Sequence, residues 1–174
     1  MSIFELALQM VLFHEGTSFV DDPNDSGGAT RYGISLRFYR SKIQSDATPD
    51  TIRNLTVNDA ADIYHKYFWE RAPFNEIVDQ NLCNRAFDLA VNIGIAHAIG
   101  CLQKAVNGCI GSHLVIDGML GEKTLEAVNS IAVENLYHQL ITQATHYYQE
   151  IVANHPQDAK FIDGWLNRLS TTPV

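Results

Sequence analysis

Apolar positions near the N-terminus recur at the spacing of an α-helix, and a loop with a small β element follows them. Between residues 3 and 14 the apolar side chains that share this spacing are Ile3, Leu6, Ala7, Met10, Val11 and Phe13. Gly16 is a typical residue for a helix to stop at. Residues 17–34 hold one proline and three glycines around two β-prone pieces, 18–20 and 30–32. This pattern predicts a loop that carries a small hairpin.

Helical spacing dominates the rest of the chain. Thr56 followed by Asp59 is typical of a helix start. The stretch 77–106 is apolar on all sides, which indicates burial at the centre of a domain. It is either one helix broken near Gly94 or two helices that meet there. The other predicted helices cover residues 35–43, 56–69, 122–130, 133–153 and 159–169. Polar connections are predicted over 45–55, which contains Pro49, and over 108–121, with a turn at Asp117-Gly118.

Length and composition fit one mainly helical domain with one small early β element. The chain has 174 residues, and 46% of them are apolar, which is enough to bury a core. The net charge is −8, so no overall positive field favours nucleic acid. Residues 26–44 contain no Asp or Glu but four basic residues, Arg31, Arg37, Arg40 and Lys42. They are either a solvated helix face or a basic rim for an anionic substrate.

Cysteine usage and the N-terminus bear on the cell compartment. Cys83, Cys101 and Cys109 have no metal-ligand spacing, and we expect free buried thiols. Cys101 and Cys109 could pair in an oxidising compartment. Residues 1–13 show no basic signal-peptide start, and no apolar run approaches the ~20 residues of a membrane span. We therefore expect a protein made in the cytoplasm that needs assistance to act outside it.

Glu15 is the strongest candidate for chemistry. It ends the first predicted helix, beside apolar neighbours and a loop rich in further carboxylates. A carboxyl group against an apolar wall tends to keep its proton and one in a wet loop tends to lose it, which suits cleavage of a glycosidic bond. The loop oxygens of Asp21, Asp22, Asn24 and Asp25 would also suit calcium, but their spacing does not match an EF-hand. The seven histidines show no paired ligand spacing, so neither a metal nor a cofactor is expected.

Several motifs in order resemble glycoside hydrolase family 108, the bacterial and phage N-acetylmuramidases of lysozyme-like fold. The matching pieces lie at residues 14–16, 22–35, 64–69, 87–94, 102–103, 117–124 and 164–168. The later ones look like the peptidoglycan-binding-type half that follows in this family. The resemblance implies a lysozyme-like α+β domain over 1–174, with a catalytic lobe at 1–75 and a helical, peptidoglycan-binding-type lobe at 76–174.

The resemblance implies that Glu15 is the catalytic acid. It also suggests kinship with phage-type lysozymes, which use Glu, Asp and Thr, and Thr30 falls at their Glu-to-Thr spacing. The Asp is out of register, because Asn24 occupies its place and Asp25 follows. Asp25 is therefore our first choice for the second carboxylate and Asp22 the alternative. Thr30 could hold the attacking water.

Five further residues are candidates for substrate binding. Asp88 and Asn92 are four apart on one helix face, so they form either a satisfied internal network or part of the cleft wall. Tyr32 either stacks on a sugar ring or packs in the core. Arg31, with Arg37, could meet the carboxylates of the substrate.

The predicted function is a muramidase that cleaves the glycan strands of bacterial peptidoglycan. Two settings fit it: a phage endolysin released by a holin, or an antibacterial toxin delivered by a type VI secretion system. An injected toxin would imply a neutralising immunity protein. The alternatives are a peptidoglycan-binding module that does not cut, and a structural piece of a phage tail or secretion apparatus. In either enzymatic setting the protein acts in the periplasm or on the cell wall.

Overall fold

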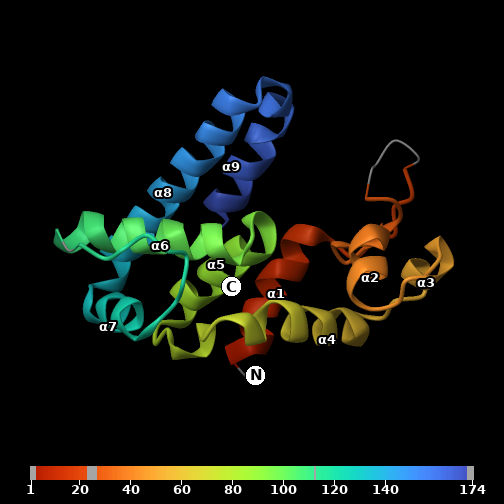
Figure 1. Ribbon diagram of the computed structural model, residues 1–174, viewed down its shortest axis with the longest axis horizontal. Coiled ribbons are helices and arrows are strands. Elements are labelled where there is room, and N and C mark those ends of the chain that lie inside the picture. Colours follow the sequence, from red (N-terminus) through yellow and green to blue (C-terminus); the bar gives the residue numbers. More distant parts are fainter. Residues whose placement is uncertain (1–2, 23–26, 112, 172–174) are drawn as a thin grey trace.

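The computed structural model describes residues 3–22, 27–111 and 113–171, and it is mainly helical with one small antiparallel hairpin (Figure 1). The elements run in the order α1 (Ile3–Glu15), β1 (Thr30–Arg31), β2 (Ile34–Ser35), α2 (Leu36–Lys42), α3 (Pro49–Arg53), α4 (Val57–Tyr67), η1 (Trp69–Arg71), η2 (Phe74–Glu76), α5 (Gln80–Ile93), α6 (Ile95–Ile110), α7 (Glu122–Ser130), α8 (Val133–Asn154), η3 (Pro156–Phe161) and α9 (Ile162–Ser170). This is the fold class that the sequence predicts.

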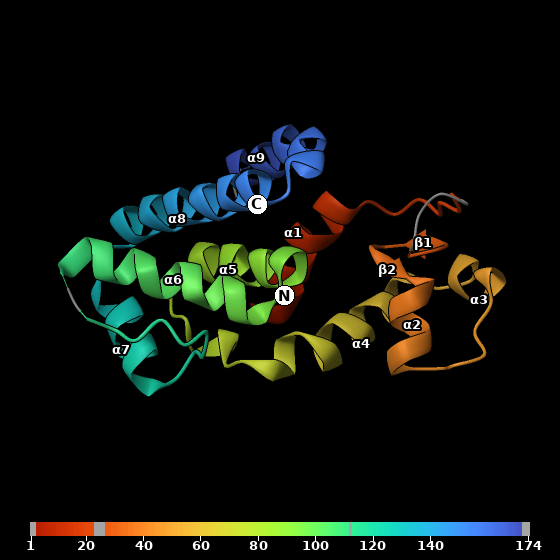
Figure 2. The same ribbon diagram turned by 45° about the horizontal axis from the view of Figure 1, so that its top comes forward.

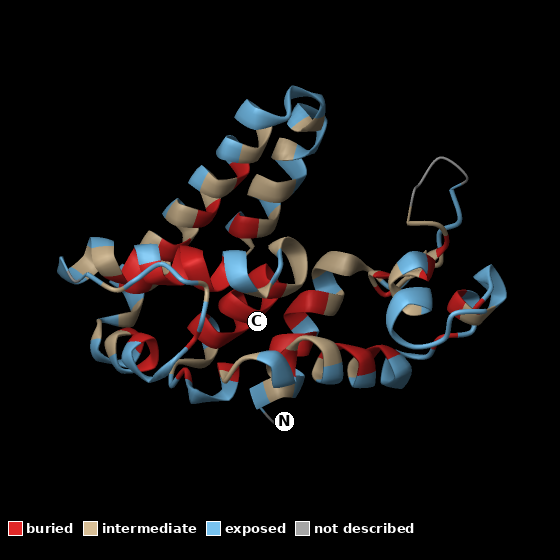
Figure 3. Ribbon diagram, in the orientation of Figure 1, coloured by how far each residue is buried: buried red, intermediate tan, exposed pale blue. Residues whose placement is uncertain are grey.

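Helix α5 lies at the centre of the molecule. It packs against α1 on one side and α6 on the other, and α6 packs in turn against α8. The buried residues concentrate in these helices, shown in red in Figure 3. Phe87 of α5 is fully buried and makes edge-on contacts with the rings of Phe4, Trp69 and Phe74. The apolar stretch from residue 77 is therefore the core of the domain, as predicted.

That stretch is two helices and not one. Gly94 separates α5 from α6 with a φ of 89°, which a residue with a side chain rarely adopts. Cys101 and Cys109 both lie on α6, eight residues or ~12 Å apart along the axis, beyond the ~7 Å reach of a disulfide. All three cysteines are free thiols, and burial raises the pKa of Cys83 to about 12. The pairing of Cys101 with Cys109, held open as an alternative, is excluded by this geometry.

The hairpin is tighter than the sequence predicts. Thr30 pairs with Ser35 and Arg31 with Ile34, and the turn between them is Tyr32-Gly33. Both turn residues have positive φ, 53° and 75°, as a two-residue turn between twisted strands requires. The predicted piece 18–20 contributes only an isolated bridge from Val20 to Thr30. The hairpin thus reverses the chain directly beside the start of α2.

Residues at the helix starts explain why α4 begins where the sequence predicts and why α3 was not predicted. Thr56 and Asp59 form the predicted capping box, with Thr56 N donating to Asp59 Oδ2 at 2.7 Å. The segment 49–53, predicted as part of a polar connection, is the short helix α3. Pro49 favours its first turn, and Thr48 N donates to Thr51 Oγ1 at 3.0 Å. Its sequence lacks apolar periodicity, which is why the pattern missed it.

Two projections flank the end of α1. The α8–α9 pair extends on one side, and the β1–β2 hairpin with α2 and α3 lies on the other (Figures 1 and 2). Helix α9 packs against α8, as both views show. The C-terminal end of α1, which carries Glu15, therefore lies between the early and late parts of the chain. No described helix is long and apolar enough to cross a membrane.

Candidate active site

Glu15 is the last residue of α1 and faces a hollow of about 310 Å³. The helix ends there because Gly16 takes a positive φ of 73°, while its N–H still donates to Leu12 O at 3.0 Å. The Glu15 side chain is 22% exposed. The hollow is bordered by residues from the hairpin, α2, α4 and α5, including Gly33, Phe38, Tyr64, Phe68, Val91 and Asn92. An acid thus meets an apolar wall that remains open to a ligand.

One oxygen of Glu15 is held by an arginine from the other end of the chain. Arg168 on α9 donates from Nη1 to Glu15 Oε1 at 2.8 Å, across 153 residues of sequence. The same guanidinium donates two hydrogen bonds to Asp88 from its other nitrogens, from Nη2 to Oδ1 at 2.8 Å and from Nε to Oδ2 at 3.2 Å. Its side chain is only 10% exposed. Arg168 therefore fixes Glu15 relative to Asp88 with a planar fork.

Asp88 is a fully buried anchor for that arginine. Each of its oxygens has a second partner: His14 Nδ1 lies 2.9 Å from Oδ1, and Arg85 Nη1 donates to Oδ2 at 3.3 Å. Burial opposes the charge of Asp88. The hydrogen bonds from His14 and Arg168 and the positive charge of Arg168 outweigh that effect, so the pKa of Asp88 lies below its usual value. Asp88 is thus a fully buried carboxylate that is joined to Glu15 through Arg168.

Arg85 ties the end of α9 to the centre of the protein. Its fully buried guanidinium donates to the backbone carbonyls of Arg168 at 3.0 Å and of Leu169 at 3.4 Å, and also to that of Thr171. The carbonyls of Arg168 and Leu169 belong to the last turn of α9, and Thr171 caps it, so no further helical N–H is available to these groups. Arg85 therefore sets the position of the backbone from which Arg168 reaches Glu15.

The other oxygen of Glu15 lies against the hairpin turn. A Cβ atom added to Gly33 would lie 2.6 Å from both Glu15 Oε2 and the Tyr64 hydroxyl, so only glycine fits there. Tyr64 donates to the Tyr32 carbonyl at 2.8 Å, which fixes the turn. Burial, and then the negative charge of Glu15, raise the pKa of Tyr64 above its ordinary value. Tyr64 therefore stays a neutral donor beside the acid.

The residues predicted for the second half of the reaction lie in or near the loop before the hairpin. Thr30 begins β1, and its hydroxyl donates to the Gly28 carbonyl at 3.2 Å. Asp22 is exposed at the start of the loop. Asp25, like Asn24, lies outside the residues that the structure describes. The choice between Asp25 and Asp22 therefore stays a prediction.

The candidate substrate-binding residues fall into different surroundings. Tyr32 is 9% exposed and belongs to the core. Arg31 lies 5.1 Å from the centre of the Tyr32 ring and donates to the backbone carbonyl of Arg53. Asn92 borders the hollow and accepts a hydrogen bond from the Tyr148 hydroxyl at 2.6 Å. Among these three side chains, Asn92 is the one that the structure brings next to Glu15.

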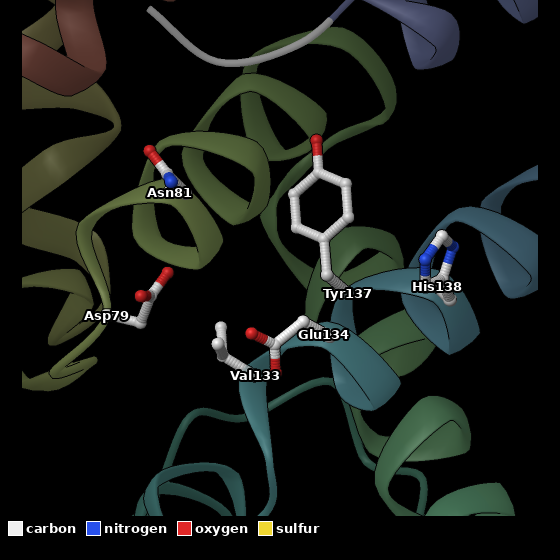
Figure 4. A pocket seen from close by; sticks show the side chains of 6 residues that line it. All are labelled: Asp79, Asn81, Val133, Glu134, Tyr137 and His138. Atoms are coloured by element: carbon white, nitrogen blue, oxygen red, sulfur yellow. The ribbon is translucent and has the colours of Figure 1, made fainter.

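A separate pocket of about 250 Å³ lies at the starts of α5 and α8 (Figure 4). Its acidic groups are Asp79, which caps α5 by accepting from Leu82 N at 2.8 Å, and Glu134. Tyr137, also in this pocket, accepts from Arg85 Nε at 3.0 Å. The pocket thus borders the buried charge network from another side and does not include Glu15. No group of three or more His, Cys, Asp or Glu in the described ranges is arranged to hold a metal ion.

The sequence pattern missed the residues that position Glu15. Arg168 was part of a matching motif but had no assigned role, and His14 was one of seven histidines that show no paired ligand spacing. Gly33 and Tyr64 were not singled out for the site. The available signals were weak: a charged residue inside the amphipathic final helix, and a glycine directly after the short β-prone piece 30–32.

A carboxyl group at the edge of an open and partly apolar hollow is suited to be one of the two carboxyl groups that a glycoside hydrolase uses. The comparisons lead to the same class. The chain belongs to the glycosyl hydrolase 108 family, whose model matches residues 8–94. Membership of this family implies glycoside hydrolase activity.

Residues 97–170 match a second family, described as a predicted peptidoglycan domain. The two matches meet between α5 and α6, whereas the lobes were expected to divide at residue 75. Since α5 packs on both α1 and α6, the lobe division stays a prediction. The whole chain is similar to the structure of Brucella abortus SagA, with 28% identity, a TM-score of 0.77 and coverage of 96% of this chain and 89% of that one. No curated protein matches the chain.

Proposed function

We propose that the protein is an N-acetylmuramidase that hydrolyses the β-1,4 bond between muramic acid and glucosamine in bacterial peptidoglycan. The observation that carries the proposal is that the two oxygens of Glu15 have different surroundings. Oε1 accepts a hydrogen bond from Arg168, and Oε2 lies beside the hairpin turn. Family membership supports a glycosidase, and the second matched segment supports peptidoglycan as its substrate.

The mechanism follows from this geometry. Because Arg168 can only donate, the proton of the acid form of Glu15 belongs on Oε2. Glu15 would pass that proton to the glycosidic oxygen, and positive charge would build on the sugar as an oxocarbenium-like species. Asp25, or Asp22 in its place, would stabilise that charge or direct water from the opposite face, with Thr30 holding the water. Two carboxyl groups ~5–5.5 Å apart would retain the configuration, and ~6.5–9.5 Å would invert it.

The biological setting is part of the proposal. Cleavage would take place in the periplasm or on the cell wall, after holin-assisted release of an endolysin or delivery of a toxin by a secretion system. The net charge of −8 weakens spontaneous binding to an anionic wall and favours assisted access. In the toxin setting an immunity protein would be a partner. A binding or structural module would have no use for an acid held in this way, which is why the enzyme is preferred.

The decisive experiment compares the wild type with Glu15→Gln on purified sacculi and identifies the released fragments by mass. We expect the wild type alone to release fragments with muramic acid at the reducing end. Glu5→Gln is the matched control, since Glu5 is an exposed glutamate of the same helix, and it should cleave like the wild type. Equal cleavage by Glu15→Gln would refute the role of Glu15, and release by none of the proteins would refute the enzymatic proposal.

A further inference from the structure

A second hollow of about 310 Å³ adjoins the active site on the side of α9. It is lined by the ends of α1 and α5 and by one face of α9, including Phe13, His14, Asn92, Gly164, Trp165 and Asn167. Asn92 lines the Glu15 hollow as well. Arg168, which also borders the second hollow, is the residue bonded to Glu15. The two hollows therefore meet at Asn92 and at the pair Glu15–Arg168.

The lining of the α9 hollow suits a sugar ring. Phe13 is 67% exposed, which presents a flat apolar surface to solvent. Trp165 is held in place because its ring stacks on Tyr148, with centroids 5.2 Å apart and planes inclined by 21°. The amide groups of Asn92 and Asn167 add donors and acceptors. Aromatic faces with a few placed amides match the CH faces, hydroxyls and N-acetyl groups of amino sugars.

Charge also favours neutral sugars in this hollow over charged peptide stems. Its cation, Arg168, is already paired with Asp88 and Glu15. The pocket at the starts of α5 and α8 instead presents the carboxylates Asp79 and Glu134, which would repel the acidic groups of peptidoglycan. Of these two hollows on the later part of the chain, the one beside Glu15 is therefore the better glycan site.

We infer that the α9 hollow is a glycan subsite of the catalytic cleft. The segment 97–170 would then bind peptidoglycan next to Glu15, and not at a separate surface. A glycan strand of the substrate would begin in the Glu15 hollow, beside Tyr64 and Phe68. It would then pass Glu15 and Asn92 and end in the α9 hollow. This inference rests on the proposed muramidase function and names the place where the C-terminal segment meets the substrate. Arg85 and Arg168 hold α9 against the core, so the subsite is fixed relative to the acid.

The test fills the hollow without disturbing the fold. A Cβ at Gly164 would meet no atom within 4 Å, and its φ lies outside the left-handed region, so Gly164→Trp places an indole in the open space. Gly121→Trp is the matched control: that glycine is equally open, has a φ of −85° and lines neither hollow. Phe13→Ala is a second variant that removes an exposed ring and demands no new space.

Binding and cleavage are measured separately. Binding to sacculi by co-sedimentation is measured in a Glu15→Gln background, and fragment release is measured with Glu15 intact. We expect Gly164→Trp and Phe13→Ala to weaken binding by about tenfold or more, the loss of one good contact, and Gly121→Trp to bind like its parent. Binding of all three variants at the parent's level would overturn the subsite.

The two proposals fail in different ways. If the wild type releases no fragments while Gly164→Trp still loses binding, the muramidase function is refuted and the glycan subsite is supported. If the wild type cleaves and Gly164→Trp binds as well as Gly121→Trp, the function is supported and the subsite is refuted. Thermal unfolding of each variant shows whether a loss of binding reflects a loss of fold.

Discussion

Arg168 joins the two ends of the chain, because its Nη1 lies 2.8 Å from Oε1 of Glu15. Glu15 belongs to the segment that matches the glycosyl hydrolase 108 family, and Arg168 belongs to the segment that matches a predicted peptidoglycan domain. The first segment therefore contains the candidate acid but not the arginine that holds it. The second segment supplies the group that orients it.

The first prediction is that Arg168→Ala loses both activity and stability. Removing the guanidinium frees Glu15 Oε1 and, among the described residues, leaves Asp88 with His14 and Arg85 as hydrogen-bond partners. Loss of one partner of a buried ion pair costs about 3–5 kcal/mol. We expect the unfolding free energy from urea titration to fall by about that amount, and sacculus clearance to fall by about 100-fold from the misplaced acid.

Arg168→Lys separates charge from geometry. A lysine keeps the positive charge but lacks the planar fork that binds Asp88 with two nitrogens and Glu15 with a third. It should recover part of the stability and little of the activity. Wild-type clearance rates in Arg168→Ala would contradict a positioning role for this residue.

The sequence predicts most of the helices, but not the contacts that build the site. Local signals define the helices: apolar periodicity for α5 and α6, and the capping pair Thr56 and Asp59 for α4. The pair of Glu15 with Arg168 has no local signal, since it depends on how α9 returns to the core. Asp88 looked unusual because it is a charge inside an apolar helix, and the structure places it in an internal network, one of the two alternatives that the sequence left open.

The second prediction concerns acid sensitivity. The pKa of Asp88 in the folded protein lies below its value in the unfolded chain, which is ~3.9. Its ionisation therefore stabilises the fold fully above about pH 4, and this contribution is lost as the pH falls through the folded pKa. Asp88→Asn should be less stable at pH 7, because Arg85 and Arg168 lose a buried counter-charge. It should also lose less stability than the wild type between about pH 4.5 and about pH 2.5, a range that begins just above the unfolded pKa of ~3.9 and ends below it.

Urea unfolding at a series of pH values measures this difference. Asp46→Asn is a suitable control, because Asp46 is an exposed residue between α2 and α3. It should follow the wild-type pH dependence. Identical acid profiles for the wild type and Asp88→Asn would show that Asp88 does not contribute a pH-linked stabilisation.

The third prediction separates the two candidates for the second carboxylate. Asp25→Asn should reduce fragment release from sacculi by about 100-fold or more, since it removes the group that would meet the developing positive charge. Asp22→Asn should retain most of the activity. Wild-type activity in Asp25→Asn together with loss in Asp22→Asn would reverse the assignment.

Thr30→Val should lower the rate of hydrolysis if its hydroxyl positions the water, while binding to sacculi stays unchanged.

The fourth prediction uses Gly33, where the hairpin turn meets Glu15. Gly33→Ala adds a methyl group at a φ of +75°, which costs about 1–2 kcal/mol in backbone strain. The same methyl would lie 2.6 Å from Glu15 Oε2 and from the Tyr64 hydroxyl, so Glu15 must move. Gly111→Ala is the matched control, because its φ is +61° and its Cβ would meet nothing within 4 Å.

Both alanine variants should therefore lose a similar amount of stability, and only Gly33→Ala should lose activity. We expect its clearance rate on sacculi to fall by at least about tenfold, as a displacement of the acid by a fraction of an ångström requires. Thermal unfolding reports the shared strain, and the clearance assay reports the displaced carboxyl group. Equal clearance by the two variants would mean that Oε2 is not the oxygen that acts on the substrate, because the added methyl group contacts that atom directly.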